Sequence, residues 1–69
     1  MPYVNIKVTG GAEAPTVEQK RELIYEVTQL LARVLNKNPA TTVVTIDEVS
    51  MDNWGVGGES VTVRRQNAK

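Results

Sequence analysis

The reactive chemistry of this sequence is concentrated in its first two residues, Met1 and Pro2. Aminopeptidases usually remove an initiator methionine that precedes a residue as small as proline, so we expect Pro2 to become the mature N-terminus. An α-amino group titrates at about 7.7 to 8.0 in water, and an apolar pocket lowers this pKa by disfavouring the charged form. The Pro2 amine can then serve as a general base near neutral pH, which is what enolisation requires. The alternative is a proline that only begins an edge strand, where a missing N–H costs little.

Outside Pro2, the side chains with a distinct binding chemistry are Trp54 and the adjacent Arg64 and Arg65. Trp54, the single tryptophan, can form the apolar wall of a pocket, or it can be a surface residue or fill a place in the core. Arginine recognises carboxylates through two parallel hydrogen bonds, although two neighbouring arginines are as readily a solvated pair. Cysteine and histidine are absent, which excludes disulfides and removes the usual ligands of structural zinc, so no metal site is expected.

The composition is that of a small, neutral domain spanning residues 1–69. Eight Lys plus Arg balance eight Asp plus Glu, the isoelectric point is near 6.2, and no basic run is longer than a pair such as Arg64-Arg65. This gives no electrostatic case for nucleic-acid binding. No apolar run approaches the roughly 18 to 20 residues of a membrane span, and the first residues lack a signal-peptide pattern, so we expect a cytoplasmic protein without a membrane partner. A chain this short buries only about 60% of its unfolded surface, and oligomerisation is the remaining source of stability.

Two segments at the start of the chain predict a strand and a connector that hold Pro2 in place. Residues 3–8 alternate in polarity and are rich in β-branched side chains, which predicts a strand with one apolar face. Residues 9–15 contain two glycines and a proline, which break this period. No Gly-Lys-Ser/Thr follows the glycines, so a connector is favoured over a phosphate-binding loop.

The strongest periodic pattern follows the connector. A capping box of Thr16 and Gln19 predicts a helix that begins at Val17, and Asn36 and Pro39 predict its end. Apolar residues recur along it at spacings of three, four and seven and form one stripe. The stripe consists of Leu23, Ile24, Val27, Leu30, Leu31, Val34 and Leu35. Core packing is favoured over a membrane or partner-groove role, because the polar face mixes both charge signs.

Residues 41–49, rich in Val, Ile and Thr, predict a second strand. A strand, a helix and a strand make a right-handed crossover with parallel strands. One helix covers one face of such a sheet, whereas parallel sheets are normally covered on both faces. We therefore expect identical subunits to cover the second face.

Residues 50–63 predict a C-terminal hairpin arm with glycines where the backbone turns and a short strand at residues 60–63. A hairpin of this size is not stable alone, so we expect it to lie across another subunit. Residues 66–69 are expected to form a frayed tail. The predicted fold class is α/β (α+β), a single β-α-β protomer with a parallel two-stranded sheet and a short C-terminal hairpin arm.

Four segments spread over nearly the whole chain resemble the tautomerase superfamily, and specifically its short members like 4-oxalocrotonate tautomerase. They are Met1-Pro2, the helix start Glu18-Gln19-Lys20, the strand that ends in Glu48, and Trp54-Gly55-Val56-Gly57-Gly58-Glu59. The resemblance implies a tautomerase-like fold and a homohexamer built as a trimer of dimers. It also implies that Pro2 moves protons between carbons of an enol or dienol 2-oxo acid without a cofactor.

The sequence departs from the family pattern where substrate carboxylates are bound. Two arginines of the family's reference enzyme correspond to Pro15 and Val43, and neither residue can bind an anion. Trp54 carries over as the aromatic wall of the pocket. Arg64 and Arg65 are the first candidates for the missing carboxylate contacts. Weaker candidates are Lys7, Arg33 and Lys37.

Three functions are compatible with these residues. The first is an isomerase in which Pro2 acts as general base and then acid, Trp54 shapes the pocket, and a backbone N–H or an arginine polarises the carbonyl. The second is a hydratase or dehalogenase of the same superfamily, which needs an acidic residue to activate water. The third is a non-catalytic oligomeric module in which Pro2 has no chemical role.

Overall fold

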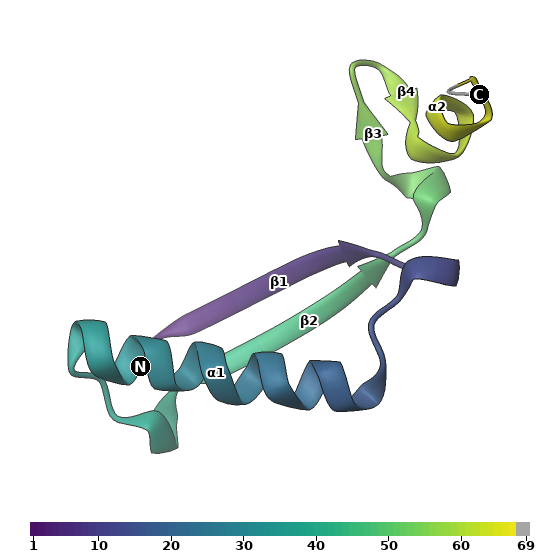
Figure 1. The fold of residues 1–69 in the computed structure, drawn as a ribbon. Helices are drawn as coiled ribbons and strands as arrows, with labels where there is room; N and C mark the ends of the chain where they lie inside the picture. The colour runs from purple at the N-terminus through teal and green to yellow at the C-terminus, as the bar shows by residue number, and fades with distance from the viewer. Residues whose placement is uncertain (68–69) are drawn as a thin grey trace.

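Two parallel strands form the centre of the structure, a computed structural model that describes residues 1–67 (Figure 1). β1 spans Tyr3–Thr9 and β2 spans Val43–Val49, and their register aligns Tyr3 with Val43 and Thr9 with Val49. Backbone bonds extend the ladder at both ends: the Val43 N–H donates to the Pro2 carbonyl at 3.0 Å, and the Gly10 N–H donates to the Val49 carbonyl at 2.8 Å. Pro2 is therefore fixed to the sheet by its carbonyl, although its nitrogen takes no part in the ladder.

Helix α1, Val17–Leu35, joins the two strands and has the ends that the sequence predicts. The Thr16 hydroxyl accepts the Gln19 backbone N–H at 3.1 Å, and the Gln19 side chain accepts the Thr16 N–H at 2.8 Å, which completes the capping box. At the other end Asn36 adopts the left-handed conformation with φ of 54°. The capping box, the helix start and the helix end are all confirmed.

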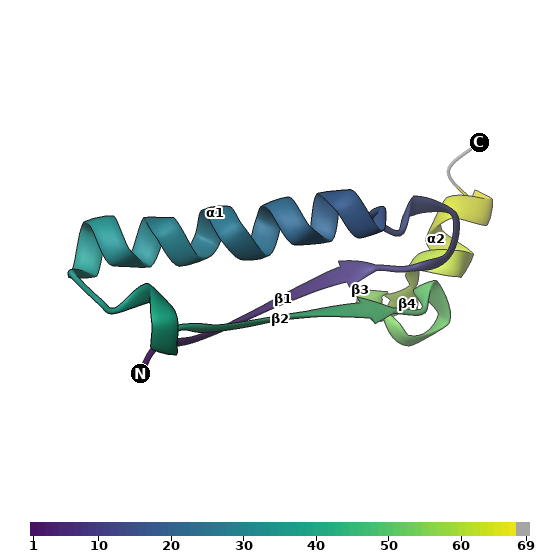
Figure 2. The ribbon, with the colours of Figure 1, turned by 90° about the horizontal axis from the view of Figure 1, so that it is seen from below.

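Figure 2 shows α1 lying over one face of the sheet. An ion pair between Lys20 of α1 and Glu48 of β2 identifies that face. Since side chains alternate along a strand, the residues that share it are Val4, Ile6 and Val8 of β1 with Val44 and Ile46 of β2. The apolar face predicted for the first strand is thus the face that α1 covers.

The opposite face of the sheet carries a row of polar side chains. Asn5 donates to the Thr45 hydroxyl at 2.7 Å and to the Asp47 carboxylate at 3.0 Å. Lys7 donates to the same carboxylate at 3.0 Å, and the Tyr3 hydroxyl lies 3.1 Å from that of Thr45. The Lys7 ammonium, followed by Asn5, lowers the pKa of Asp47 below its ordinary value. This face is held together by hydrogen bonds across the strands, and no helix of residues 1–67 lies over it (Figure 2).

Two short 3-10 helices adjoin the strands, and one of them corrects a predicted boundary. η1 spans Gly11–Glu13 in the connector, and η2 spans Pro39–Thr41. The second strand was predicted from residue 41 but begins at Val43. The reason is local, because the Asn38 side chain accepts the Ala40 N–H at 2.9 Å and Pro39 occupies the first turn of η2.

Residues 51–67 form a separate C-terminal arm that stands at one end of the sheet (Figure 1). The arm contains η3 at Met51–Asn53, β3 at Gly55–Val56, β4 at Glu59–Ser60 and α2 at Val61–Asn67. β3 and β4 pair antiparallel around a two-residue turn. Gly57 and Gly58 have φ of 63° and 89°, the region that this turn requires and that glycine adopts without strain. The predicted hairpin is confirmed.

The strand predicted at residues 60–63 is wrong beyond Ser60, because α2 begins at Val61. The Ser60 hydroxyl accepts the Val63 backbone N–H at 3.2 Å, as an N-cap residue does. This cap outweighs the β-branched character of the residues that follow it. Gln66 and Asn67 belong to α2 instead of a frayed tail, and the rest of the predicted tail, residues 68–69, lies outside the described residues.

One protomer lacks a closed core. Among residues 1–67 no hydrophobic side chain is buried. The radius of gyration is 15.4 Å, whereas a compact chain of this length is expected near about 11 Å. The half-buried centre of the α1 stripe includes Val27 and Leu31, whereas Leu23, Ile24 and Leu30 on its flanks are exposed. Within the described residues no helix combines the length and apolar character needed to cross a bilayer.

Candidate active site

Pro2 is half-buried and directly precedes β1, where the hydrogen bond from the Val43 N–H to its carbonyl fixes its position. Met1 precedes it with 89% of its surface exposed, so removal of this residue disturbs no packing. While Met1 is attached, the Pro2 nitrogen is an amide without basicity. After its removal, the nitrogen becomes a secondary amine at the end of the sheet.

The end of the protomer that carries Pro2, the Pro2 end, is apolar and has no acidic residue of its own. It is formed by the first residues of β1 and β2, the last turn of α1 and η2. Exposed apolar side chains on these elements are Tyr3, Val34, Leu35 and Val43. Arg33 and Lys37 add positive charge, and no Asp or Glu occurs in residues 1–12 or 27–46. Apolar surroundings and neighbouring cations both disfavour the charged form of an amine.

Trp54 lies at the far end of the sheet, inside the arm. Its backbone N–H donates to the Met51 carbonyl at 3.4 Å, and its backbone carbonyl accepts the Val61 N–H at 2.8 Å. The residue is half-buried between η3 and the start of α2. These contacts give Trp54 a fixed place in the arm while leaving part of it available to a partner.

Arg64 and Arg65 lie on α2 but have different partners. The Arg65 guanidinium donates to both carboxylate oxygens of Glu13, at 2.7 and 3.0 Å, and Thr9 donates to the same carboxylate. Hydrogen bonding from Arg65, then from Thr9, lowers the pKa of Glu13, and the carboxylate raises the pKa of Arg65. Within residues 1–67 the Arg64 guanidinium makes one long hydrogen bond of 3.5 Å, to the Val56 carbonyl. The two arginines predicted as equivalent candidates are therefore distinct.

The structure brings Trp54, Arg64 and Arg65 together but places Pro2 apart from them. β2 runs from Val43, beside Pro2, to Val49, and the arm follows Val49 (Figure 1). A strand of this length spans roughly 20 Å at about 3.3 Å per residue. No single protomer can place its own Trp54 against its own Pro2 in this arrangement.

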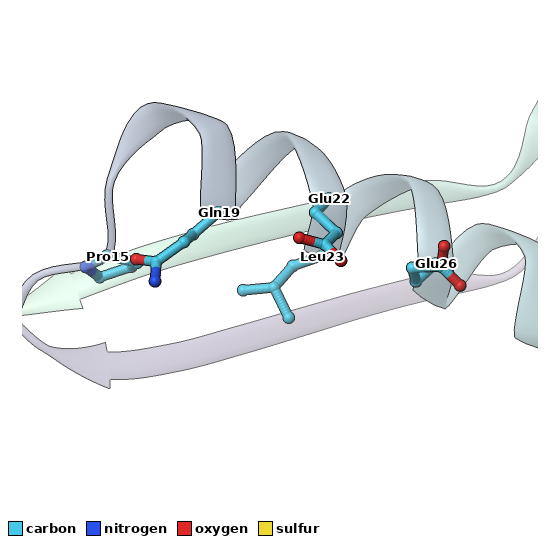
Figure 3. Close-up of a pocket in the computed structure, with 5 residues that line it drawn as sticks. All are labelled: Pro15, Gln19, Glu22, Leu23 and Glu26. Atoms are coloured by element: carbon cyan, nitrogen blue, oxygen red, sulfur yellow. The ribbon is translucent and has the colours of Figure 1, made fainter.

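An open groove of about 410 Å³ runs along the first half of α1 (Figure 3). It is lined by Pro15, Gln19, Glu22, Leu23 and Glu26. The Leu23 side chain extends from α1 toward the strands, while Glu22 and Glu26 lie along the rim of the groove (Figure 3). The groove is far from Pro2, because α1 begins at the other end of the sheet. In residues 1–67 no group of three or more Asp, Glu, His or Cys could hold a metal ion.

A family model described as "Tautomerase enzyme" matches residues 2–64 of the chain. The chain belongs to the tautomerase family. Probable tautomerase K2 of Dickeya dadantii (strain 3937) is 65% identical over 68 residues, which are 99% of this chain and 98% of that relative. The 2-hydroxymuconate tautomerase of Bacillus subtilis (strain 168) is 34% identical over 62 residues, which are 90% of this chain and 95% of that relative.

Solved structures of tautomerases have the same fold. The structure of DmpI from Helicobacter pylori is 52% identical, with a TM-score of 0.85 over 94% of this chain and 97% of that chain. A heterohexamer 4-oxalocrotonate tautomerase from Chloroflexus aurantiacus J-10-fl is 29% identical, with a TM-score of 0.78 over 90% of this chain and 95% of that chain. The predicted family, the tautomerase fold class and the assignment of this chain as an isomerase are confirmed.

Sequence reasoning missed Glu13, the residue of this tautomerase that binds Arg65. Glu13 and Arg65 are 52 positions apart, and no periodic pattern connects the connector to the last helix. A weak signal was present, because Glu13 is the only acidic residue in the connector and Arg65 belongs to an adjacent pair of arginines. The sequence alone does not favour an ion pair between Glu13 and Arg65 over two separately solvated charges. The pair could therefore be identified only from the structure.

Proposed function

We propose that this tautomerase interconverts enol and keto forms of a 2-oxo acid without a cofactor, with the Pro2 amine as general base and then as general acid. The amine removes the proton of the enol hydroxyl, and the resulting ammonium returns a proton to carbon. The substrate is thereby isomerised with no net gain or loss of atoms. The observation that carries the proposal is the place of Pro2, which directly precedes β1 at an apolar end of the sheet with exposed side chains.

The surroundings of Pro2 support this role because they favour a neutral amine. Exposed apolar residues such as Tyr3 and Val43 become a desolvating pocket once a second copy covers them. Arg33 and Lys37 disfavour a third positive charge and also attract an anionic substrate. Both effects bring the pKa of an α-amino group toward or below neutral pH, where general base catalysis is most effective.

The complete site is formed between copies of the chain. The arm of one copy supplies Trp54 and Arg64 or Arg65 to the Pro2 end of another, because the arm cannot reach the Pro2 of its own chain. The missing core supports the same assembly, since the exposed apolar flanks of α1 need cover. A hexamer, a trimer of dimers, is the form that we propose, since the Chloroflexus structure that resembles this chain is a heterohexamer.

The substrate class follows from the name of one relative and from the arginines of this chain. The Bacillus subtilis relative is named for 2-hydroxymuconate, a dienol with two carboxylates. Here Pro15 lies in the α1 groove and Val43 at the Pro2 end, so neither position supplies a cation. Arginine on the partner's arm then provides the carboxylate contact. We expect substrates with one carboxylate beside the enol to bind at least as well as dicarboxylates.

The hydratase or dehalogenase alternative is less well supported. Those reactions need an acid to activate water, and no Asp or Glu occurs in residues 1–12 or 27–46, the ranges that contain the Pro2 end. A non-catalytic module is the weakest hypothesis, because the chain is a tautomerase by family. Localisation in the cytoplasm stays a prediction of the sequence.

The experiment compares three forms of the chain in enol–keto conversion of phenylenolpyruvate and of 2-hydroxymuconate, followed by ultraviolet absorbance. The reference form is the wild-type chain with Met1 removed. In the second form Met1 is retained, so the Pro2 nitrogen is an amide, and the rate should fall about 10² to 10⁴-fold. Pro2→Ala with Met1 removed retains a primary amine in nearly the same place and should lose only part of the rate. Equal rates in all three forms would show that Pro2 has no chemical role.

A further inference from the structure

The arm is attached to the rest of the protomer at very few points. The backbone connects it through Ser50, and within residues 1–67 the Glu13–Arg65 pair is the one side-chain hydrogen bond or ion pair between the arm and the β-α-β unit. The other polar contacts of the arm within the described residues are with the adjacent Ser50 or internal, for example that of Thr62 with Asp52. Figure 1 shows the same separation, with the arm standing clear of α1.

The geometry of the Glu13–Arg65 pair suits it to fix the orientation of the arm relative to the β-α-β unit. Two parallel N–H to oxygen bonds, at 2.7 and 3.0 Å, hold the planar guanidinium and carboxylate groups in one relative orientation. Thr9, at the end of β1, donates to the same carboxylate and fixes Glu13 in turn. Arg65 also lies 4.0 Å from the Met51 sulfur, in the turn that holds Trp54. The pair thus connects the end of the sheet to the support of Trp54.

We propose that Glu13 and Arg65 are positioning residues, an ion-pair latch that orients the arm so that Trp54 and Arg64 meet the Pro2 of a neighbouring copy. The proposal deepens the proposed function and rests on it. It assigns the substrate carboxylate to Arg64, because the Arg65 guanidinium already donates two hydrogen bonds to the Glu13 carboxylate. Among the described residues Arg64 makes one long hydrogen bond, to the Val56 carbonyl, and its exposed side chain lies beside the Gly57 turn.

The strength of the Glu13–Arg65 ion pair determines whether its loss changes folding stability or substrate binding. Both side chains are partly exposed, Arg65 by 55% and Glu13 by 40%, and ion pairs at the surface contribute little to folding. Pre-organisation of a binding element, however, changes affinity without changing the contacts made with the ligand. Loss of the latch should therefore raise KM and leave kcat and the oligomer nearly unchanged.

The test uses E13Q, R65Q, the charge swap E13R/R65E, and R64Q, each assayed with phenylenolpyruvate. E13Q and R65Q should each raise KM about twofold to fivefold with kcat nearly unchanged, and the swap should restore most of the loss. R64Q should raise KM by about tenfold or more, since it removes a charged contact with the substrate itself. Native mass spectrometry checks that every variant keeps the wild-type assembly.

Two results would overturn the proposal. If R65Q raises KM as strongly as R64Q and the swap restores nothing, Arg65 binds the substrate and is not a positioning residue. If E13Q leaves both KM and the fluorescence of Trp54 unchanged, Glu13 does not orient the arm.

The fluorescence of the single tryptophan separates a failure of the latch from a failure of the proposed function. Acrylamide quenching of Trp54 should increase in E13Q and R65Q and return toward the wild-type value in the swap. This readout holds even if the Met1-retaining chain proves as active as the wild type, a result that would overturn the role of Pro2 alone. Unchanged quenching in both single variants would overturn the latch.

Discussion

The β-α-β unit and the C-terminal arm are stabilised in different ways. The unit has a parallel ladder seven residues long and a 19-residue helix whose apolar stripe faces the sheet. The arm has strands of two residues, and its shape depends on particular residues, such as the glycine turn and the Ser60 cap. Substitutions in the unit should therefore change stability, whereas substitutions in the arm should change substrate binding.

The largest expected effect on stability is in the β-α-β unit. Leu31→Ala removes a half-buried side chain from the centre of the α1 stripe and should lower the free energy of unfolding by about 2 kcal/mol. Gln29→Ala on the polar face of the same helix is the matched control and should stay within about 0.5 kcal/mol. Guanidinium denaturation measures both. A loss below about 0.5 kcal/mol for Leu31→Ala would mean that the stripe does not hold the unit together.

A glycine of the arm should give a smaller stability loss with a larger effect on catalysis. Gly58 has φ of 89°, and a non-glycine residue in left-handed backbone costs roughly 1 to 2 kcal/mol. Gly58→Ala should distort the hairpin, raise KM and leave the circular dichroism of α1 nearly intact. Gly55→Ala, at a position without positive φ, is the control. Equal KM values for both variants would contradict a role for this turn.

Loss of the N-terminal cap of α1 should lower the stability of the β-α-β unit and leave the arm unchanged. Thr16→Ala removes the hydroxyl that accepts the Gln19 N–H and should cost about 1 kcal/mol. Thermal unfolding should show the loss, while KM and the quenching of Trp54 stay at wild-type values. A change in KM would mean that the unit and the arm are coupled more strongly than their few contacts indicate.

Acid should affect the two regions through different carboxylates. The pKa of Glu13 is lowered mainly by Arg65 and that of Asp47 mainly by Lys7. Each pair thus stabilises the folded chain above the ordinary pKa of its carboxylate and loses this effect as the pH falls through the lowered pKa. NMR titration of the carboxyl carbons should show both shifts. R65Q should return the Glu13 titration toward its ordinary range and leave Asp47 unchanged, and a shift of both would contradict their independence.

The sequence predicted the β-α-β unit well because periodic patterns report on long elements. The alternation in β1 and the stripe and capping box of α1 each depend on residues close together in the chain, as does the glycine turn of the arm. Helix α2 was missed because Val61, Thr62 and Val63 favour a strand, while one hydroxyl, that of Ser60, decides the outcome. A local preference of this kind is easily overridden by its context.

The candidate site was predictable only in its parts. Pro2, Trp54, Arg64 and Arg65 could be named from residue type and the family resemblance, but their roles stay predictions. Their separation into two ends of one protomer follows from the parallel register, in which Tyr3 aligns with Val43. The difference between the two arginines depends on Glu13, a contact over 52 positions that no local pattern predicts.

The central claim is that each active site combines the Pro2 of one copy with the arm of another. The most direct measurement mixes two weakened chains, one that retains Met1 with an intact arm and one that has a free Pro2 with Trp54→Ala and Arg64→Gln. After co-refolding, the mixed oligomers should have an activity on phenylenolpyruvate well above the sum of the two parents, because some sites pair a free Pro2 with an intact arm. If native mass spectrometry shows mixed oligomers and the activity does not exceed that sum, the shared site is wrong.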